Sequence, residues 1–251
     1  MRNIRLLIAF DGTGYNGWQR QKFDATVQGE IESRLALMTK EVILLHGAGR
    51  TDAGVHAEGM VANFLSESRI SCPTFFQGLN SLLPGAIRIL QVSEESPDFH
   101  ARFSAKGKHY QYNISTDPVL MPVERLYSLH VPFPLDETAL SACLACLIGT
   151  HDFASFENAG SRDKTRLNSR GSVRTLSLAD GRKTGNHRYT FSFIGDGFLR
   201  QMVRNLVGTL LEVGLGRRTV EGFQHSLAAK KRSTAGPSAP PQGLTLKEVF
   251  Y

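Results

Sequence analysis

The segment "TVQGEIESRLALM", residues 26–38, has the spacing of an amphipathic helix, and the fold can be worked out from its neighbours. Apolar residues recur in it every three or four positions, which places them on one helix face. These residues are Val27, Ile31, Leu35 and Met38. Thr26 stands where an N-cap residue accepts a hydrogen bond from the first helical turn. The segment therefore predicts a helix that begins directly after Thr26.

Short apolar runs on both sides of this helix have the length and composition of β-strands. They span 4–10, 42–46, 60–65 and 87–92. A second helix is predicted over 73–83, with Pro73 in its first turn and Pro84-Gly85 behind its end. The first part of the chain is therefore expected to run strand–helix–strand–strand–helix–strand.

The second part of the chain repeats that order. Strands are expected over 107–115, 172–178, 187–194 and 244–250. Helices are expected after the capping residue Asp136, over 198–213 with strong periodicity, and over 219–229 as an addition to the repeat. The polar segment 157–171 is interpreted as a surface loop, and "STAGPSAPPQG", 233–243, as an ordered connection.

Two rounds of this order are typical of the split β-α-β, ferredoxin-like arrangement. We therefore predict an α+β protein in which each half forms an antiparallel sheet with its helices on one face. The halves are predicted to span 1–104, which carries Asp52, and 105–251, which carries basic loops and the additional helix. Two such sheets side by side would leave a basic cleft between them.

Composition favours a globular protein with an anionic partner. Hydrophobic residues make up 41% of the 251 positions, too many for a disordered chain, and the net charge is +6 at pH 7. Eight lysines and arginines lie between Arg162 and Arg188, and Lys230-Lys231-Arg232 forms another basic run. Such loops fit a nucleic acid, although a solubilising surface explains the charge equally well.

The cysteines and the apolar runs indicate a location. Cys72, Cys143 and Cys146 give no disulfide framework and suit a reducing compartment. No signal peptide is visible, and the first apolar run is too short to cross a membrane. We therefore expect a cytoplasmic protein without a membrane segment.

Two short motifs could indicate a cofactor or a metal. "GTGYNG", 12–17, matches G-x-G-x-x-G, but a dinucleotide site needs a helix directly behind the glycines, and here the helix begins only near Thr26. Cys143-x-x-Cys146 could supply half of a zinc site with His151, but no second ligand pair has suitable spacing. Both sulfurs fall in a periodic helix, so we interpret them as core residues. We expect no metal and no small-molecule cofactor.

"GAGRTDAGVHA", 47–57, is the strongest candidate for chemistry. Asp52 and Arg50 stand two residues apart among glycines and alanines. An aspartate in a tight loop is usually a turn or cap residue. In the functional interpretation Asp52 is a nucleophile, and its small neighbours let a large substrate approach closely. Arg50, or an arginine of the helix 198–213, would keep the carboxylate charged.

Two other pairs admit a functional and a structural interpretation. Arg200 and Arg204 are four apart in the predicted helix 198–213, and like charges at that spacing call for an acidic partner unless both extend into solvent. Tyr110 and Tyr112 alternate on a predicted strand and so point the same way, which suits either stacking on bases or core packing.

Eight ordered blocks make the sequence resemble the tRNA pseudouridine synthase A family along nearly its whole length. The blocks are "FDGTGYNGWQRQ", "TVQGEIE", "GRTDAGVHA", "DFHARFSA", "YQY", "HDFASF", "FLRQMVRNLVG" and "GPSAPPQGL". The segment 157–171 is the least familiar part.

This resemblance implies a role for four residues. Asp52 matches the catalytic aspartate, and Arg204 the arginine that pairs with it. Tyr110 matches the tyrosine that packs on the target uracil, and Arg50 the arginine implicated in displacing the target base. The resemblance also implies two ferredoxin-like domains, a homodimer, a tRNA substrate and no cofactor. The implied reaction is that of an isomerase, an intramolecular transferase that converts uridine to pseudouridine at positions 38, 39 and 40 of the anticodon stem-loop.

Two other classes of protein are compatible with parts of this sequence. A non-catalytic RNA-binding module could use the same order of strands and helices and would not need Asp52, but its usual Gly-Phe-Gly-Phe-like strand pattern is absent. An enzyme with a nucleotide cofactor would use the glycines of 12–17.

Overall fold

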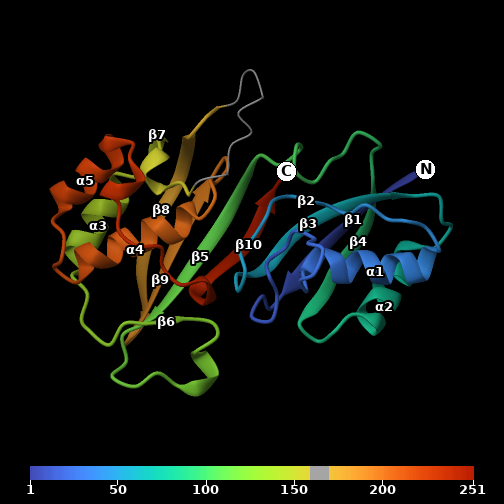
Figure 1. The fold of residues 1–251 in the computed structure, drawn as a ribbon, viewed down its shortest axis with the longest axis horizontal. Coiled ribbons are helices and arrows are strands. Elements are labelled where there is room, and N and C mark those ends of the chain that lie inside the picture. The colour runs from blue at the N-terminus through green and yellow to red at the C-terminus, as the bar shows by residue number, and fades with distance from the viewer. Residues whose placement is uncertain (159–169) are drawn as a thin grey trace. The chain divides into compact units, whose positions relative to one another are not determined.

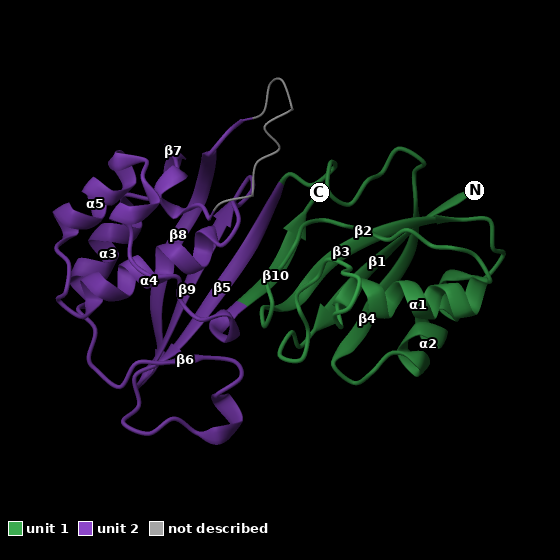
Figure 2. Cartoon of the chain, in the orientation of Figure 1, with its two compact units in different colours: residues 1–106, 245–251 green, residues 107–244 purple. Residues whose placement is uncertain are grey.

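The computed structural model describes residues 1–158 and 170–251, which form two compact units. The first unit contains residues 1–106 and 245–251, and the second contains residues 107–244 (Figure 2). The sequence suggested a boundary after residue 104 and placed the last strand in the second half. In the structure nearly all of that strand, β10 (Leu244–Phe250), belongs to the first unit, because it pairs in parallel with β3 (His56–Ser66).

The first unit is built on a sheet with the strand order β4–β1–β3 (Figure 1). β1 (Arg2–Phe10) is antiparallel to both β3 and β4 (Ile87–Glu95). The short β2 (His46–Gly47) is antiparallel to β3. Two helices, α1 (Val27–Thr39) and α2 (Cys72–Leu82), contact each other, and α2 packs against β4. The unit therefore has the predicted order of two helices among four strands, with β10 in addition.

Both helices of this unit begin at a capping side chain. Thr26 Oγ1 accepts a hydrogen bond from Gly29 N at 3.3 Å, which confirms the N-cap predicted from the sequence. Ser71 caps α2 in the same way by accepting from Thr74 N at 3.3 Å. These bonds satisfy amide groups that have no partner within the helix.

The strand predicted over 42–46 is largely wrong, because only its last residue falls in β2. Burial alternates along the segment as in a strand, with Ile43 and Leu45 buried and Val42 and Leu44 exposed. However, the backbone of Leu45 is bonded to side chains of α1: its N–H donates to Glu32 and its carbonyl accepts from Gln28. Side chains have taken the place of a neighbouring strand.

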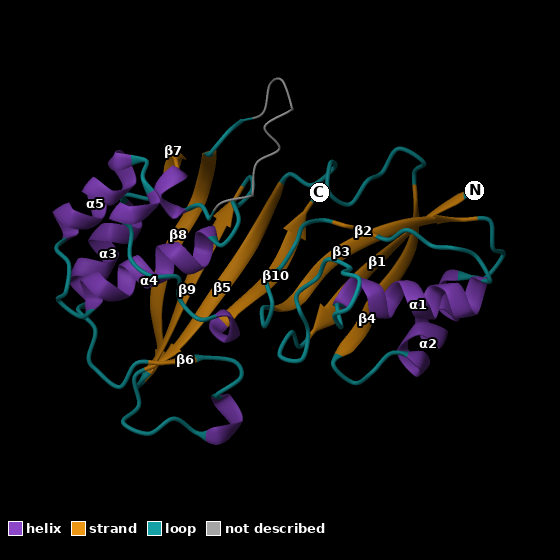
Figure 3. Cartoon of the chain, in the orientation of Figure 1, coloured by secondary structure: helices purple, strands orange, loops and turns teal. Residues whose placement is uncertain are grey.

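The second unit contains the sheet order β5–β9–β8–β7, with all three pairings antiparallel. The strands are β5 (Gly107–Ser115), β7 (Gly149–Asp152), β8 (Val173–Gly185) and β9 (Arg188–Gly195), and the short β6 (Leu129–His130) pairs in parallel with β5. The helices are α3 (Glu137–Ala145), α4 (Met202–Gly214) and α5 (Val220–Ala229). Helix α3 packs against β8 and contacts α4 and α5 (Figure 3).

Two predicted elements of this unit have different ends in the structure. The β8–β9 hairpin continues to Gly185 and Arg188, so its turn is much tighter than the predicted loop. Helix α4 begins at Met202, because Gln201 takes the left-handed conformation with φ 60°. Arg200 therefore precedes the helix, its carbonyl accepts from Asn158 N at 3.2 Å, and the predicted like-charged face of Arg200 and Arg204 is wrong.

The segment 233–243 is an ordered connection, as predicted. It contains parts of two short 3₁₀ turns, Arg232–Thr234 and Pro241–Gly243. Gly236 N donates to Thr209 Oγ1 at 2.9 Å, which attaches the segment to α4. Within the described ranges 1–158 and 170–251, no helix has both the length and the hydropathy needed to cross a membrane.

Candidate active site

Asp52 lies on a tight turn between β2 and β3. Its carbonyl accepts a hydrogen bond from Val55 N at 3.2 Å, which closes the turn. Gly54 has φ 76°, in the left-handed region that a glycine adopts without a steric penalty. The Asp52 residue is half-buried, and the preceding Thr51 is buried. Turn geometry therefore accounts for Gly54 and holds the backbone of Asp52.

The "GTGYNG" segment packs directly on this turn. A Cβ atom on Gly12 would lie 2.1 Å from Val55 O, and one on Gly17 would lie 2.4 Å from Thr51 O. Two backbone hydrogen bonds join the segments, from Trp18 N to Thr51 O at 3.2 Å and from Gly54 N to Tyr15 O at 3.3 Å. The first and last glycines of the motif thus serve the chain's own close packing, which is a different use from cradling a pyrophosphate.

A buried tryptophan explains another of the small residues. Trp18 is 2% exposed and packs near Phe10, with ring centroids 6.1 Å apart. A Cβ atom on Gly47 would lie 2.5 Å from Trp18 Nε1. Gly47 is therefore small because the indole needs the space, and Gly54 is small because of its backbone angle. Gly47 and Gly54 are therefore explained without the hypothesis that small residues here let a substrate approach.

Arg50 is exposed, but its guanidinium is tethered. Its Nε donates to Gln19 Oε1 at 3.0 Å. Gln19 could not be identified from the sequence, because the contact joins segments 31 residues apart. Its place inside the block "WQRQ", 18–21, was the one signal in the sequence that could have drawn attention to Gln19.

Tyr110 and Tyr112 lie on β5 and are both buried, at 7% and 0% exposure. Tyr110 packs edge-on against Phe198, with ring centroids 5.0 Å apart. The Tyr112 hydroxyl donates to Pro240 O at 2.7 Å, and burial raises the pKa of Tyr112 well above its usual value of 10.0. The prediction that both rings point the same way is confirmed, and Tyr112 has the core-packing role.

Arg204 is held against the connection 233–243. Its Nε donates to Ala239 O at 2.7 Å, and its own carbonyl accepts from Ala239 N at 2.9 Å. Gly208, one turn further along α4, permits this contact, since a Cβ atom there would lie 1.8 Å from Pro237 O. These two hydrogen bonds therefore hold both the backbone of Arg204 and the Nε of its guanidinium.

A buried asparagine beside Arg204 could not be identified from the sequence. Asn205 has 0% exposure, and its Nδ2 donates to Phe156 O at 2.8 Å and to Asn158 Oδ1 at 3.1 Å. Its Oδ1 accepts from Arg232 at 3.1 Å. Arg232 also donates to the carbonyls of Ala235 and Gly236, and desolvation lowers its pKa. This arginine of the basic run 230–232 is thus part of the protein's internal framework.

The basic stretch 162–188 also makes internal contacts wherever the structure describes it. Arg170 pairs with Asp196, Arg182 with Asp180, Lys183 with Glu137, and Arg188 with Asp117 and Glu124. Arg174 donates to the carbonyls of Gly171 and Val173. Arg162, Lys164 and Arg166 lie outside the described residues. Exposed ion pairs are weak, so these arginines and lysines can still bind an anionic partner. Their acidic partners nevertheless reduce the net positive charge of this surface.

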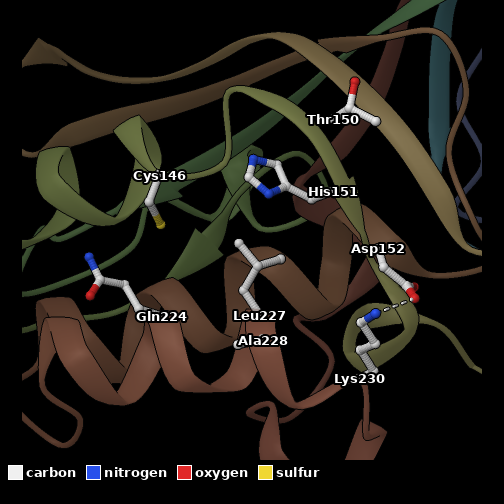
Figure 4. Close-up of a pocket in the computed structure, with 8 residues that line it drawn as sticks. All are labelled: Cys146, Thr150, His151, Asp152, Gln224, Leu227, Ala228 and Lys230. Atoms are coloured by element: carbon white, nitrogen blue, oxygen red, sulfur yellow. Dashed lines mark ion pairs between the residues drawn. The ribbon is translucent and has the colours of Figure 1, made fainter.

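A cavity of about 420 Å³ lies in the second unit, between β7, the end of α3 and α5 (Figure 4). Its lining includes Cys146, His151 and the pair formed by Lys230 Nζ and Asp152 Oδ2 at 3.5 Å. The predicted site residues Arg50, Asp52, Tyr110 and Arg204 do not line it.

Cys143 and Cys146, the pair considered for zinc, differ in burial. Cys143 is buried, and burial raises the pKa of its thiol to about 12, whereas Cys146 is half-buried just after α3. In the part of the chain that the structure describes, no group of three or more His, Cys, Asp and Glu side chains could hold a metal ion. Cys143 therefore has the predicted core role, while Cys146 lies at the end of the helix and faces a cavity.

The four predicted site residues fall on both units. Arg50 and Asp52 belong to the first unit, on the segment between β2 and β3. Tyr110 and Arg204 belong to the second unit, on β5 and α4. Each is held by its own surroundings: a closed turn for Asp52, Gln19 for Arg50, Phe198 for Tyr110 and Ala239 for Arg204.

The tRNA pseudouridine synthase family matches the chain over residues 6–104 and 144–251. The tRNA pseudouridine synthase A 1 of Desulfotalea psychrophila is 57% identical over 251 residues, which is 100% of both chains. The tRNA pseudouridine synthase A of Acetivibrio thermocellus is 42% identical, again over 100% of both chains. A crystal structure of a Cbf5-Nop10-Gar1 complex has a TM-score of 0.40 at 12% identity, over 97% of this chain and 48% of that chain. The family match includes Arg50, Asp52 and Arg204, and the two full-length relatives also span Tyr110.

Proposed function

We propose that this chain, which belongs to the tRNA pseudouridine synthase family, isomerises uridine to pseudouridine in tRNA. The observation that carries the proposal is the fixed backbone of Asp52, a half-buried residue on a turn that is closed by Val55 and packed against Gly12 and Gly17. A nucleophile has to be positioned before the substrate arrives, and a locked turn does this at little entropic cost.

The reaction rearranges one nucleotide. The bond from uracil N1 to ribose C1′ breaks, the base turns, and a new bond forms from C5 to C1′. The C5 proton leaves to solvent and N1 gains a proton, so no oxidant, reductant or phosphoryl donor is consumed. One carboxylate suffices as the nucleophile or as the proton acceptor, and we assign this part to Asp52. The enzyme is thus an isomerase of the intramolecular-transferase type, and we propose that it works without metal or cofactor.

The other site residues are assigned to binding and positioning. The target base must leave the helical stack, at a cost of a few kcal/mol. We assign Arg50 to its displacement and Tyr110 to packing on the extruded uracil, an interaction worth about 1–3 kcal/mol per stacked base. Arg204 is assigned to pairing with Asp52. By likeness to the family, the targets are positions 38, 39 and 40 of the anticodon stem-loop.

The architecture that we propose consists of two ferredoxin-like halves. The antiparallel pairings β4–β1–β3–β2 in the first unit and β5–β9–β8 in the second support this assignment. The basic cleft between the halves, the homodimer and the cytoplasmic location are proposed from the resemblance to the family.

Chemical mapping of pseudouridine tests the function. Transcribed tRNA is incubated with the wild type, with Asp52→Asn or with Asp24→Asn, and is then treated with a carbodiimide that blocks reverse transcription at pseudouridine. Asp24 is an exposed aspartate before α1 and serves as the matched control. We expect stops at positions 38–40 with the wild type and Asp24→Asn, and no stops with Asp52→Asn. Stops with Asp52→Asn would remove the nucleophile assignment, and their absence in all samples with intact tRNA binding would favour the RNA-binding module.

A further inference from the structure

A chain of amide side chains leads from the interior of the first unit to Arg50. Arg50 Nε donates to Gln19 Oε1 at 3.0 Å, and Gln19 Nε2 donates to Gln28 Oε1 at 2.7 Å. Arg50 is exposed, Gln19 is half-buried and Gln28 is only 4% exposed. An exposed guanidinium is thereby attached to a buried group on α1.

The backbone fixes which end of the Gln28 amide is which. Its Oε1 accepts from Arg20 N at 2.8 Å, and its Nε2 donates to Leu45 O at 2.9 Å. A backbone N–H can only donate and a carbonyl can only accept, so exchanging oxygen and nitrogen would oppose both bonds. The orientation of Gln28 therefore follows from its surroundings.

Glu32 completes the buried end of the chain. It is 6% exposed, and its Oε1 accepts from Gln28 Nε2 at 3.1 Å and from Leu45 N at 3.0 Å. Its Oε2 accepts from Arg20 Nη1 at 2.9 Å. A buried polar network in which every member has partners is rigid, because an alternative arrangement leaves groups unsatisfied. Gln28 is thus held at both ends of its amide.

The orientation of the Gln28 amide determines that of Gln19, and Gln19 in turn determines which atom Arg50 meets. Because Gln28 presents an oxygen, Gln19 must turn its Nε2 toward Gln28 and its Oε1 toward Arg50. A guanidinium has donors only, so an oxygen is what Arg50 requires. The bond engages the Nε–H, so the two terminal nitrogens are not the atoms that Gln19 holds. These are the donors suited to a phosphate or a base edge.

We propose that Gln19, oriented by Gln28, is a positioning residue that holds Arg50 ready to displace the target base. This inference rests on the proposed function, in which Arg50 has that role. An exposed arginine otherwise samples many rotamers, and ordering it when the RNA binds costs conformational entropy. The tether removes part of that cost before binding, so Gln19 acts on the rate through Arg50.

The test compares two glutamines of the same segment. Gln19→Met keeps the length of the side chain and removes the amide. Gln21→Met is the matched control, because Gln21 is exposed and its Nε2 donates to the nearby Asn16 O at 3.2 Å. Tritium release from tRNA carrying 5-tritiated uridine is measured in a single turnover with excess enzyme, and thermal unfolding is measured alongside. We expect Gln19→Met to be about tenfold slower and Gln21→Met to be unchanged.

Three further measurements separate positioning from a merely structural role. In an Arg50→Ala background, Gln19→Met should change the rate by less than about twofold, because the effects of coupled residues do not add. The defect should shrink on tRNA whose target uridine is mismatched, since an unpaired base is easier to displace. Gln19→Glu, which keeps an acceptor for Arg50, should fall between the wild type and Gln19→Met, and it serves if the Met variant does not fold.

The outcomes distinguish the positioning role of Gln19 from the synthase function. Equal rates for Gln19→Met and Gln21→Met, or a full additional loss in the Arg50→Ala background, would overturn the positioning role while leaving the synthase function intact. Release by none of the proteins, including the wild type, would overturn the proposed function and this inference with it.

Discussion

Replacing Gly17 by alanine should disable the enzyme by moving the turn that carries Asp52. Gly17 has φ 81°, a conformation that costs an L residue about 1–2 kcal/mol. Its new Cβ atom would lie 2.4 Å from Thr51 O, although real Cβ contacts essentially never fall below 3.0 Å. The two backbones must therefore separate by about 0.6 Å, because the obstacle is backbone rather than a flexible side chain.

The expected effect follows from these two terms. Strain and crowding together should lower the free energy of unfolding by about 2–4 kcal/mol. The displaced turn should also slow pseudouridine formation by about 10- to 100-fold, since a full 1 Å misplacement can cost about 100-fold. Urea unfolding and single-turnover tritium release measure the two effects separately.

Gly14→Ala is the control from the same motif. Gly14 is exposed, and a Cβ atom there would have no neighbour within 4 Å. It should change stability by less than about 0.5 kcal/mol and leave the rate unaltered. If Gly17→Ala behaved like Gly14→Ala in both assays, the packing of this segment on the Asp52 turn would not be what places the carboxylate.

Three other predictions follow from the second unit and from the thiols. Gly208→Ala would bring a Cβ atom to 1.8 Å from Pro237 O, so it should detach the connection 233–243 from Arg204. Tritium release should then be at least about tenfold slower, and an unchanged rate would contradict this prediction. Desolvation opposes the charge on Asp152, but hydrogen bonds from Ser172 and Ala154 and the nearby cation of Lys230 together outweigh it, so the pKa of Asp152 is lowered from 3.8. Its stabilising contribution is therefore present above the unfolded pKa and is lost as pH falls through the folded value. Ser172→Ala should lower the free energy of unfolding, measured in urea at pH 7, by about 1 kcal/mol. The difference from the wild type should shrink below about pH 4, and a difference that grew with acid would refute the lowered pKa of Asp152. Burial raises the pKa of Cys143 to about 12, so iodoacetamide at pH 8 should leave this thiol unmodified in the folded protein and label it in urea. Peptide mass spectrometry measures the labelling, and rapid labelling of the folded protein would contradict the burial of Cys143.

Local signals in the sequence predicted the elements whose boundaries depend on neighbouring residues. Thr26 caps α1 as expected, and the alternation of Tyr110 and Tyr112 on β5 places both rings on one buried face. The start of α4 could not be predicted, because periodicity extends to Phe198 while the left-handed Gln201 interrupts the backbone. The parallel pairing of β10 with β3 is likewise decided by residues almost two hundred positions apart.

The site shows the same division between local and distant causes. Asp52 was identified from its own turn, which needs only adjacent residues. The use of Gly12 and Gly17 depends on their contact with Val55 and Thr51, and the G-x-G-x-x-G pattern alone could not reveal it. The link from Arg50 through Gln19 to Gln28 was invisible for the same reason, since each contact joins different segments of the chain.

The most direct test of the central claim is tritium release from tRNA carrying 5-tritiated uridine, measured with the wild type and with Asp52→Asn while tRNA binding is followed for both. Formation of the C5–C1′ bond displaces the hydrogen at C5, so the label must enter water. We predict release by the wild type and none by Asp52→Asn, with equal binding. Release by Asp52→Asn at the wild-type rate would contradict the role of Asp52, and binding without release by either protein would contradict the synthase function itself.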